Sequence, residues 1–196
     1  DNEVVERNVS CVYDYHLSEF RPELIGDSVK VRQFVNNREQ TNQALLYCLD
    51  SHENIVNLVQ GKLPFKIKLN PYVRTYKLLS NGEELKAQLS RISGSSNVLR
   101  IFSDRTADTI RFTSYNPCNL LFSYFIYRDN KLITKGMDST LNYVITHRLN
   151  HTYRVLYEYM YAGSIENRSV ICQLPDKTLH LTVKQPELVY PGQKVK

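Results

Sequence analysis

Two histidines four residues apart, His147 and His151, have the spacing in this chain that most resembles a metal site. On a helix, this spacing would place both imidazoles on one face, where they could bind zinc. The surrounding residues instead predict a strand that runs into a turn, where the spacing loses this meaning. No cysteine or carboxylate nearby completes a tetrahedral set of ligands. We therefore expect two surface histidines and no metal.

The four cysteines, Cys11, Cys48, Cys118 and Cys172, are far apart and include no CxxC pair. This spacing argues against a zinc site and against a thioredoxin-type redox motif. They could form two disulfides in any of three pairings, or remain as buried thiols that pack like small apolar side chains. We favour thiols, because a chain of 196 residues needs no covalent cross-links to fold.

The common signatures of catalysis are missing from the sequence. It contains no GxSxG elbow, no HExxH motif, no P-loop and no dinucleotide-binding glycine pattern. The paired acids Glu83 and Glu84 lie at an expected turn, where solvent would cover them. We therefore expect no catalytic residue, no cofactor and no enzymatic activity.

The segment TYRVLYEYMYAG, which begins at Thr152, could instead bind a partner through aromatic rings. In a strand, alternate residues share one face, and this places four tyrosines together. The candidate protein or glycan contact residues are Tyr153, Tyr157, Tyr159 and Tyr161. Flat amphipathic rings give a large contact area at low entropic cost. The alternative, which we favour, is a central strand whose tyrosines pack in the core.

Composition argues against nucleic-acid binding and against a membrane span. The formal net charge is +5, but lysine and arginine are spread thinly, whereas phosphate binding favours clustered cations. No apolar stretch approaches the roughly 18 residues of a membrane span. The chain begins at Asp1 without a charged and apolar leader, so we expect any targeting segment to have been removed or to lie outside it. We predict neither nucleic-acid binding nor a membrane span in this segment.

Alternation of apolar and polar residues with period 2 runs through nearly the whole chain. The expected strands are residues 9–16, 28–35, 43–49, 64–69, 75–79, 85–92, 98–102, 108–114, 119–127, 131–134, 141–146, 153–161, 168–174 and 178–184. Turn residues at Asn81–Glu84 and Asp129–Asn130 separate apolar runs. Short strands at this spacing predict antiparallel β-sandwiches.

The small-residue segment RISGSSN, Arg91–Asn97, divides the chain almost in half and is an expected linker. The two halves resemble each other: DSVKVRQFVNNREQTNQALLYCLDS matches DTIRFTSYNPCNLLFSYFIYRDN, and LPFKIKLNPYVRTYKLL matches LNYVITHRLNHTYRVL. The sequence therefore predicts an all-β protein of two tandem antiparallel β-sandwich domains, immunoglobulin-like or macroglobulin-like, at residues 1–93 and 97–186. The closing QPELVYPGQKVK predicts a turn and a new strand, so residues 187–196 are expected to start a further domain.

Four segments of the second half carry a family resemblance: VLRIFS, NLLFSYFIYRDNKLITKG, YRVLYEYMYAGSIENRSVICQLPDKTLHLTV and PELVYPGQKVK. Together they resemble the macroglobulin-type sandwich domains of bacterial alpha-2-macroglobulin-like proteins, particularly the large forms from Bacteroidetes-type organisms. The resemblance covers about residues 98–196, and residues 9–92 share only the architecture.

This resemblance implies a large extracytoplasmic protein that traps proteases through a bait region and, often, a thioester. A thioester needs a cysteine with a glutamine three residues on, and the strings CVYD, CLDS, CNLL and CQLP do not qualify. We therefore expect a non-enzymatic scaffold segment that is secreted, periplasmic or on the cell surface. Its expected partners are the neighbouring domains of a longer chain and a protease. The alternative is a cell-surface adhesin or glycan-binding module that uses the tyrosine-rich face.

Overall fold

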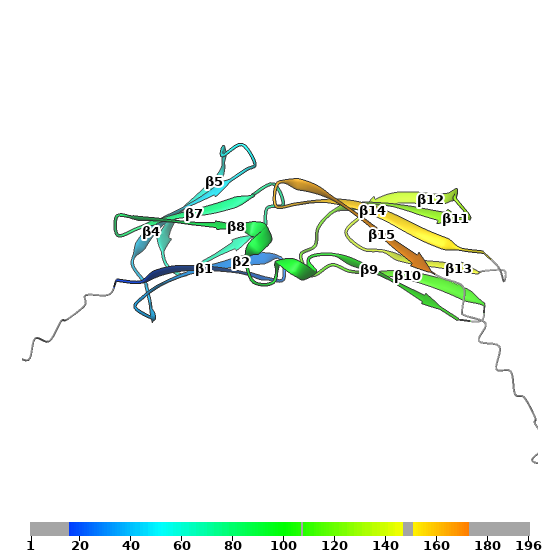
Figure 1. The fold of residues 1–196 in the computed structure, drawn as a ribbon, viewed down its shortest axis with the longest axis horizontal. Coiled ribbons are helices and arrows are strands. Elements are labelled where there is room, and N and C mark those ends of the chain that lie inside the picture. Colours follow the sequence, from blue (N-terminus) through cyan, green and yellow to red (C-terminus); the bar gives the residue numbers. More distant parts are fainter. Residues whose placement is uncertain (1–15, 107, 147–150, 173–196) are drawn as a thin grey trace, which may run out of the picture.

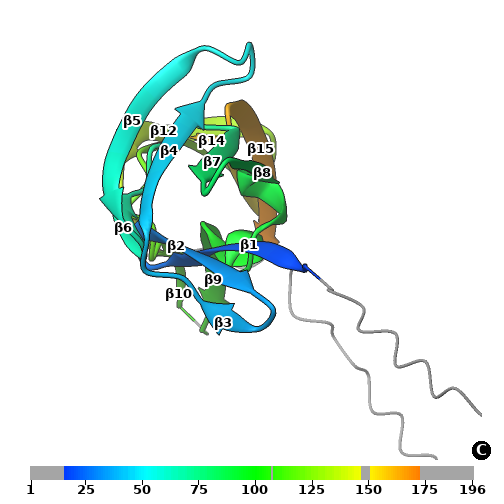
Figure 2. The same cartoon turned by 90° about the vertical axis from the view of Figure 1, so that its left-hand side faces the viewer.

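The computed structural model describes residues 16–106, 108–146 and 151–172, which form two β-sandwiches lying end to end (Figure 1). One sheet of the first sandwich contains β1 (Ser18–Ile25), β2 (Ser28–Val35), the short β3 (Arg38–Glu39) and β6 (Phe65–Lys68). The other sheet has the order β5 (Ile55–Lys62), β4 (Gln43–Leu49), β7 (Thr75–Ser80) and β8 (Glu83–Gln88). Figure 2 looks along the long axis and shows the two sheets as facing layers.

The second sandwich repeats this topology. One sheet has the order β13 (Asn142–Thr146), β10 (Thr109–Tyr115) and β9 (Arg100–Arg105). The other has the order β12 (Lys131–Asp138), β11 (Phe122–Arg128), β14 (Tyr153–Tyr161) and β15 (Ser164–Cys172). Strands β9 to β15 therefore correspond in turn to β1, β2, β4, β5, β6, β7 and β8. The expected fold class, all-β with two tandem antiparallel sandwiches, is confirmed.

The core of each sandwich lies between its sheets and follows from the alternation of side chains along the strands. In β2, Val29, Val31 and Gln33 point inward and are fully buried, while their neighbours are only partly buried. In β10, Ile110 and Phe112 take the equivalent positions and are also fully buried. Period-2 patterning thus decides which face of each strand becomes core.

Four two-residue hairpins have positive φ at both turn residues, which is the geometry of type I′ turns. These turns are Asn36–Asn37, Asn81–Gly82, Asp129–Asn130 and Ala162–Gly163. Their backbone twist matches that of the flanking strands, so each pair of strands continues without splaying. The turns expected at residues 81–84 and 129–130 are confirmed.

Two long strands, β1 and β5, and the two-residue β3 were missing from the expectation. β1 carries Pro22, which lowers strand propensity, yet β1 lies beside only β2 in its sheet, where a proline is tolerated. β5 is exposed along most of its length and pairs only with β4, so no alternation marks it. The strand expected at 178–184, the domain start at 187–196 and most of the strand expected at 9–16 lie outside the described residues. The predicted domain limits therefore stay predictions.

The segment between the sandwiches is packed, although the sequence predicted a linker. It forms two short 3₁₀ helices, η1 (Leu89–Arg91) and η2 (Ser95–Asn97). Leu89 is fully buried, and the Leu24 amide donates a hydrogen bond of 2.9 Å to the Ser93 carbonyl. Within the described residues, no helix is long and apolar enough to cross a membrane.

Gly94 makes this packing possible. It has a φ of +86°, and a Cβ added there would lie 2.4 Å from the Leu24 carbonyl oxygen. We expect Gly94→Ala to lower the free energy of unfolding by about 3 kcal/mol, because backbone strain and a backbone clash add. Gly82→Ala is the matched control: its φ is +81° but the space around it is open. It should cost only about 1 kcal/mol. Urea unfolding of both variants measures this difference, and equal losses would contradict the packing of Gly94.

Candidate functional site

The tyrosine-rich strand β14 faces the core. Tyr153, Tyr157, Tyr159 and Tyr161 are each at most 5 % exposed, which agrees with the favoured interpretation of a central strand whose tyrosines pack in the core. The other interpretation, an exposed protein or glycan contact face made of these four residues, does not fit this burial. The rings of Tyr157 and Tyr159 stack with centroids 6.2 Å apart, and burial raises the pKa of both hydroxyls. A partner therefore has no access to these rings as a flat surface.

β14 extends further than its counterpart in the first sandwich, and the extension carries two of these tyrosines. The segments TYK in β7 and TYR at the start of β14 occupy equivalent places. β7 ends at Ser80, four residues after Tyr76, whereas β14 ends at Tyr161, eight residues after Tyr153. Tyr159 and Tyr161 therefore have no equivalent in β7. They lengthen the second sandwich at the end that faces the first.

This extension bonds directly to the first sandwich. The Tyr161 hydroxyl donates a hydrogen bond of 3.4 Å to the carbonyl of Leu89 in η1. At the β14–β15 turn, the Gly163 amide donates one of 3.0 Å to the Pro71 carbonyl in the β6–β7 loop. Figure 1 shows this turn reaching the loop that precedes β7. We call this region, with Pro71, Leu89, Tyr161 and Gly163 as its bonded residues, the junction.

A side chain at position 163 would be strained and tightly packed at the junction. Gly163 has a φ of +72°, and a Cβ there would lie 3.2 Å from the Tyr72 carbonyl oxygen and 3.3 Å from the Arg74 Cβ. The sequence expectation did not include Gly163, Pro71 or Leu89 as functional residues. The signal that could have found them is the four extra residues of β14 relative to β7, because additional alternating residues must find a surface to cover them.

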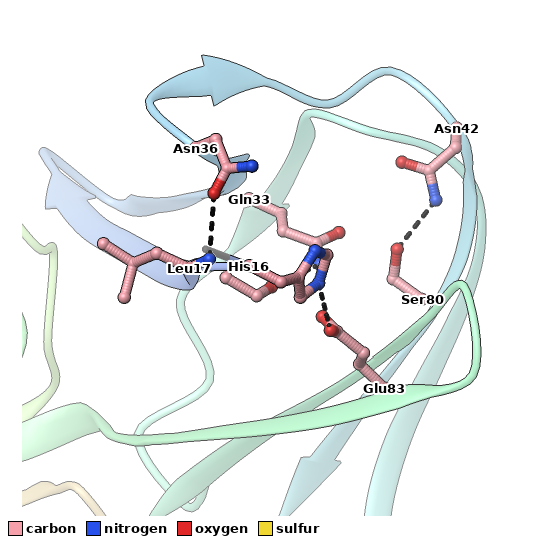
Figure 3. A network of polar contacts seen from close by, with 8 residues as sticks. His16, Leu17, Gln33, Asn36, Asn42, Ser80 and Glu83 are labelled. Carbon is pink, nitrogen blue, oxygen red and sulfur yellow. Dashed lines mark hydrogen bonds and ion pairs between the residues drawn. The ribbon is translucent and has the colours of Figure 1, made fainter. Parts of the chain in front are cut away.

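The opposite end of the first sandwich is closed by a polar network (Figure 3). The buried Gln33 side chain donates a hydrogen bond of 3.1 Å from Nε2 to the Ser18 hydroxyl. His16 Nε2 lies 2.6 Å from a Glu83 carboxylate oxygen, and Asn42 donates a hydrogen bond of 2.7 Å to the Ser80 hydroxyl. Ser80 and Glu83 face each other across the β7–β8 hairpin, which joins the two halves of the network.

The order of groups in this network is not that of a catalytic triad. Hydrogen bonds from the Ser18 hydroxyl and, to a lesser extent, from His16 lower the pKa of Glu83. The carboxylate therefore stands between the hydroxyl and the imidazole, whereas nucleophilic catalysis needs the imidazole in the middle to take the hydroxyl proton. Two acceptors on residues of the same network, Gln33 Oε1 and Asn42 Oδ1, are buried without a hydrogen-bond partner among the described residues. The network acts as a polar cap on the core.

The two histidines considered as metal ligands are not brought together in the described part of the chain. His147 lies outside the described residues, and the His151 imidazole pairs with the Asp129 carboxylate at the β11–β12 turn. The Thr152 amide also donates to Asp129, and this bond, followed by that from His151, lowers the pKa of the carboxyl group. Over the described ranges, no group of three or more His, Cys, Asp or Glu side chains could hold a metal ion.

Three of the four cysteines are described, and all three are free thiols in the core. Cys48 is 1 % exposed, Cys118 6 % and Cys172 4 %. Burial raises the pKa of the Cys48 and Cys118 thiols to about 11. Of the two alternatives left open by the sequence, buried thiols hold for these three residues, and Cys11 lies outside the described residues.

Comparison with known proteins gives no family for this chain. No family model matches it, and no curated protein matches it. Among solved structures, the central fibronectin-III array of RIM-binding protein is similar at 10% sequence identity. The match covers 81% of this chain and 68% of that chain, with a TM-score of 0.27. A likeness this weak carries no argument about function.

The polar cap generates a pH-dependent prediction. Because the pKa of Glu83 is lowered below its ordinary value of 4.5, its interactions stabilise the fold above that pH and are lost as the pH falls through the lowered pKa. We expect Glu83→Gln to lower the melting temperature at pH 7 and to match the wild type near pH 2. Glu39→Gln, at an exposed position, is the control and should change neither value. A difference that persists at pH 2 would contradict this role of Glu83.

The buried thiols generate a second prediction. At pH 8, a thiol with a pKa of about 11 has roughly a hundredfold less thiolate than an ordinary cysteine. We expect iodoacetamide to leave Cys48 and Cys118 unmodified in the native protein and to modify both in urea, as measured by peptide mass spectrometry. An added exposed cysteine, Arg38→Cys, is the internal control. Native modification at a rate close to that of the control would refute their burial.

Proposed function

We propose that the chain is a non-enzymatic scaffold segment of a large extracytoplasmic, alpha-2-macroglobulin-like protease-trapping protein. In this role the two sandwiches act as one rigid spacer between neighbouring domains. The observation that carries the proposal is the junction, where the second sandwich is hydrogen-bonded to the first at Pro71 and at Leu89.

The junction supports a rigid spacer because the connection has little freedom to bend. A flexible linker is rich in small exposed residues, and its ends move independently. Here Leu89, Ile92, Val98 and Leu99 around the connecting segment are all buried. Two inward tyrosines of the β14 extension add further buried area on the other side. Bending at the junction would expose these side chains and break two hydrogen bonds.

The alpha-2-macroglobulin part of the proposal is supported by the resemblance of residues 98–196 and by the two-sandwich architecture. The lack of a cysteine with a glutamine three residues on is compatible with a segment that holds other working parts in place. The alternative, an adhesin or glycan-binding module that uses Tyr153, Tyr157, Tyr159 and Tyr161, has lost its main support, since these rings are buried.

A distance measurement between the sandwiches tests the spacer. Nitroxide labels at Arg38→Cys in β3 and Lys131→Cys in β12, with Cys11→Ser, place one probe in each sandwich. We expect electron–electron double resonance to give a single narrow distance distribution. Gly163→Val should broaden it, because a side chain there forces the β14–β15 turn away from Tyr72.

Gly82→Val is the matched control for this measurement. Its backbone has a similar positive φ, but no atom lies within 4 Å of the added Cβ and it is remote from the junction. It should leave the distribution narrow. A broad distribution in the otherwise unaltered protein would refute the rigid spacer. A parent reading frame without further β-domains would instead refute the alpha-2-macroglobulin part and leave the spacer standing.

A further inference from the structure

A surface groove of about 360 Å³ runs along the junction, and both sandwiches line it. Four large apolar side chains on its rim are exposed. Tyr72 from the β6–β7 loop is 58 % exposed, Leu121 before β11 61 %, Met137 on β12 64 % and Ile165 on β15 63 %. Contiguous exposed apolar side chains of this size mark interaction sites far more often than scattered ones do. The edge of an interface between domains is also a common place for ligands.

The groove contains both methionines of the chain, Met137 and Met160. Methionine has three rotatable bonds and a polarisable sulfur, so it adapts to apolar side chains of different shapes and is common on surfaces that bind peptides. Leu69, Leu120 and Tyr159, which are buried, line the same groove. The groove thus combines a fixed apolar base with an adaptable rim.

Two opposite charges line the groove, one from each sandwich. Lys68, at the end of β6, and Glu158, on β14, are both exposed, and neither forms an ion pair with another described residue. A ligand that fills the groove would therefore meet a cation of the first sandwich and an anion of the second. Charges of opposite sign on the ligand would complement them and set its orientation.

We propose that the groove binds an extended peptide segment of a partner protein. Two or three apolar side chains of the segment would occupy the groove, with an acidic side chain toward Lys68 and a basic one toward Glu158. A peptide satisfies these requirements together because it carries apolar anchors and both charges on one chain. This goes beyond the proposed spacer, which needs a rigid junction but no exposed apolar groove.

Designed peptides provide a direct test. The first probe is acetyl-Asp-Gly-Leu-Phe-Leu-Gly-Lys-amide, and two others replace both charged ends by Asp or both by Lys. With methyl-¹³C methionine, the protein gives only two labelled methyl signals, both from groove residues. We expect the first peptide to shift both signals in a saturable way. The two like-charged peptides should bind about threefold more weakly, because each places one charge against a like charge.

Two variants on β15 distinguish binding in the groove from non-specific binding to exposed apolar side chains elsewhere on the surface. Ile165 lines the groove, whereas Ile171 on the same strand does not and is 51 % exposed. Ile165→Ser should weaken binding by about tenfold, since it removes one apolar contact, and Ile171→Ser by less than twofold. Lys68→Glu should make the peptide with two lysines the preferred ligand, because both charges in the groove are then negative.

Four outcomes would overturn the proposal. The absence of any shift of the methionine signals at millimolar concentrations of all three peptides would refute it, and so would an Ile171→Ser variant that weakens binding as much as Ile165→Ser. Shifts that appear on concentrating the protein alone, with a dimer in analytical ultracentrifugation, would assign the groove to a second copy of the chain. Shifts caused by phosphatidylcholine vesicles but by no peptide would assign it to a lipid surface.

Discussion

The arrangement of this protein depends on the four residues by which β14 outgrows its counterpart in the first sandwich. They add two inward tyrosines, Tyr159 and Tyr161, at the end of the second sandwich that faces the first. Each buried ring of this size stabilises the fold by about 2 kcal/mol relative to exposure. Tyr161 is hydrogen-bonded to the first sandwich, so its part of this gain depends on the contact between the two sandwiches. The hydrogen bonds to Leu89 and Pro71 then fix the direction in which the two sandwiches meet.

The two sandwiches share a topology but have different residues at equivalent ends. The difference follows from whether that end of the sandwich faces water or another sandwich. The outer end of the first sandwich has Gln33, Ser80 and Glu83 where its core meets water, so polar groups bond to one another there. At the equivalent end of the second sandwich, another sandwich replaces water, and aromatic side chains take over. This polar end has an energetic penalty, because Gln33 Oε1 and Asn42 Oδ1 are buried without a hydrogen-bond partner in the described part of the chain.

The junction also joins the two proposed roles. A spacer requires that the β6–β7 loop and the β14–β15 turn stay in contact, and this contact places Tyr72 and Ile165 in the lining of one groove. The groove therefore exists only while the junction is intact. A partner that binds there would contact both sandwiches at once and would add its own contacts to those that hold them in line. Spacing and recognition would then depend on the same few residues.

Alternation in the sequence was enough to find the elements that carry the core. The strands expected at 28–35, 43–49 and 153–161 match β2, β4 and β14, because one face of each is buried and the pattern records it. The parallel order of motifs in the two halves also predicted two similar sandwiches. β5 was not predicted, because both of its faces are largely exposed and its side chains follow no period of apolar and polar residues. β1 was not predicted, because Pro22 argues against a strand in the sequence. A proline is acceptable there only because β1 lies at the edge of its sheet.

The sequence by itself thus determined the fold class, the alternation and the turns, since these follow from backbone preferences and from which residues avoid water locally. It did not determine what the tyrosines of β14 face, because a buried and an exposed aromatic stripe have the same period. Nor could it bring Gly163 to Pro71, or Lys68 to the same groove as Glu158. Those contacts join residues some ninety positions apart in sequence, and only the packing of one sandwich on the other creates them.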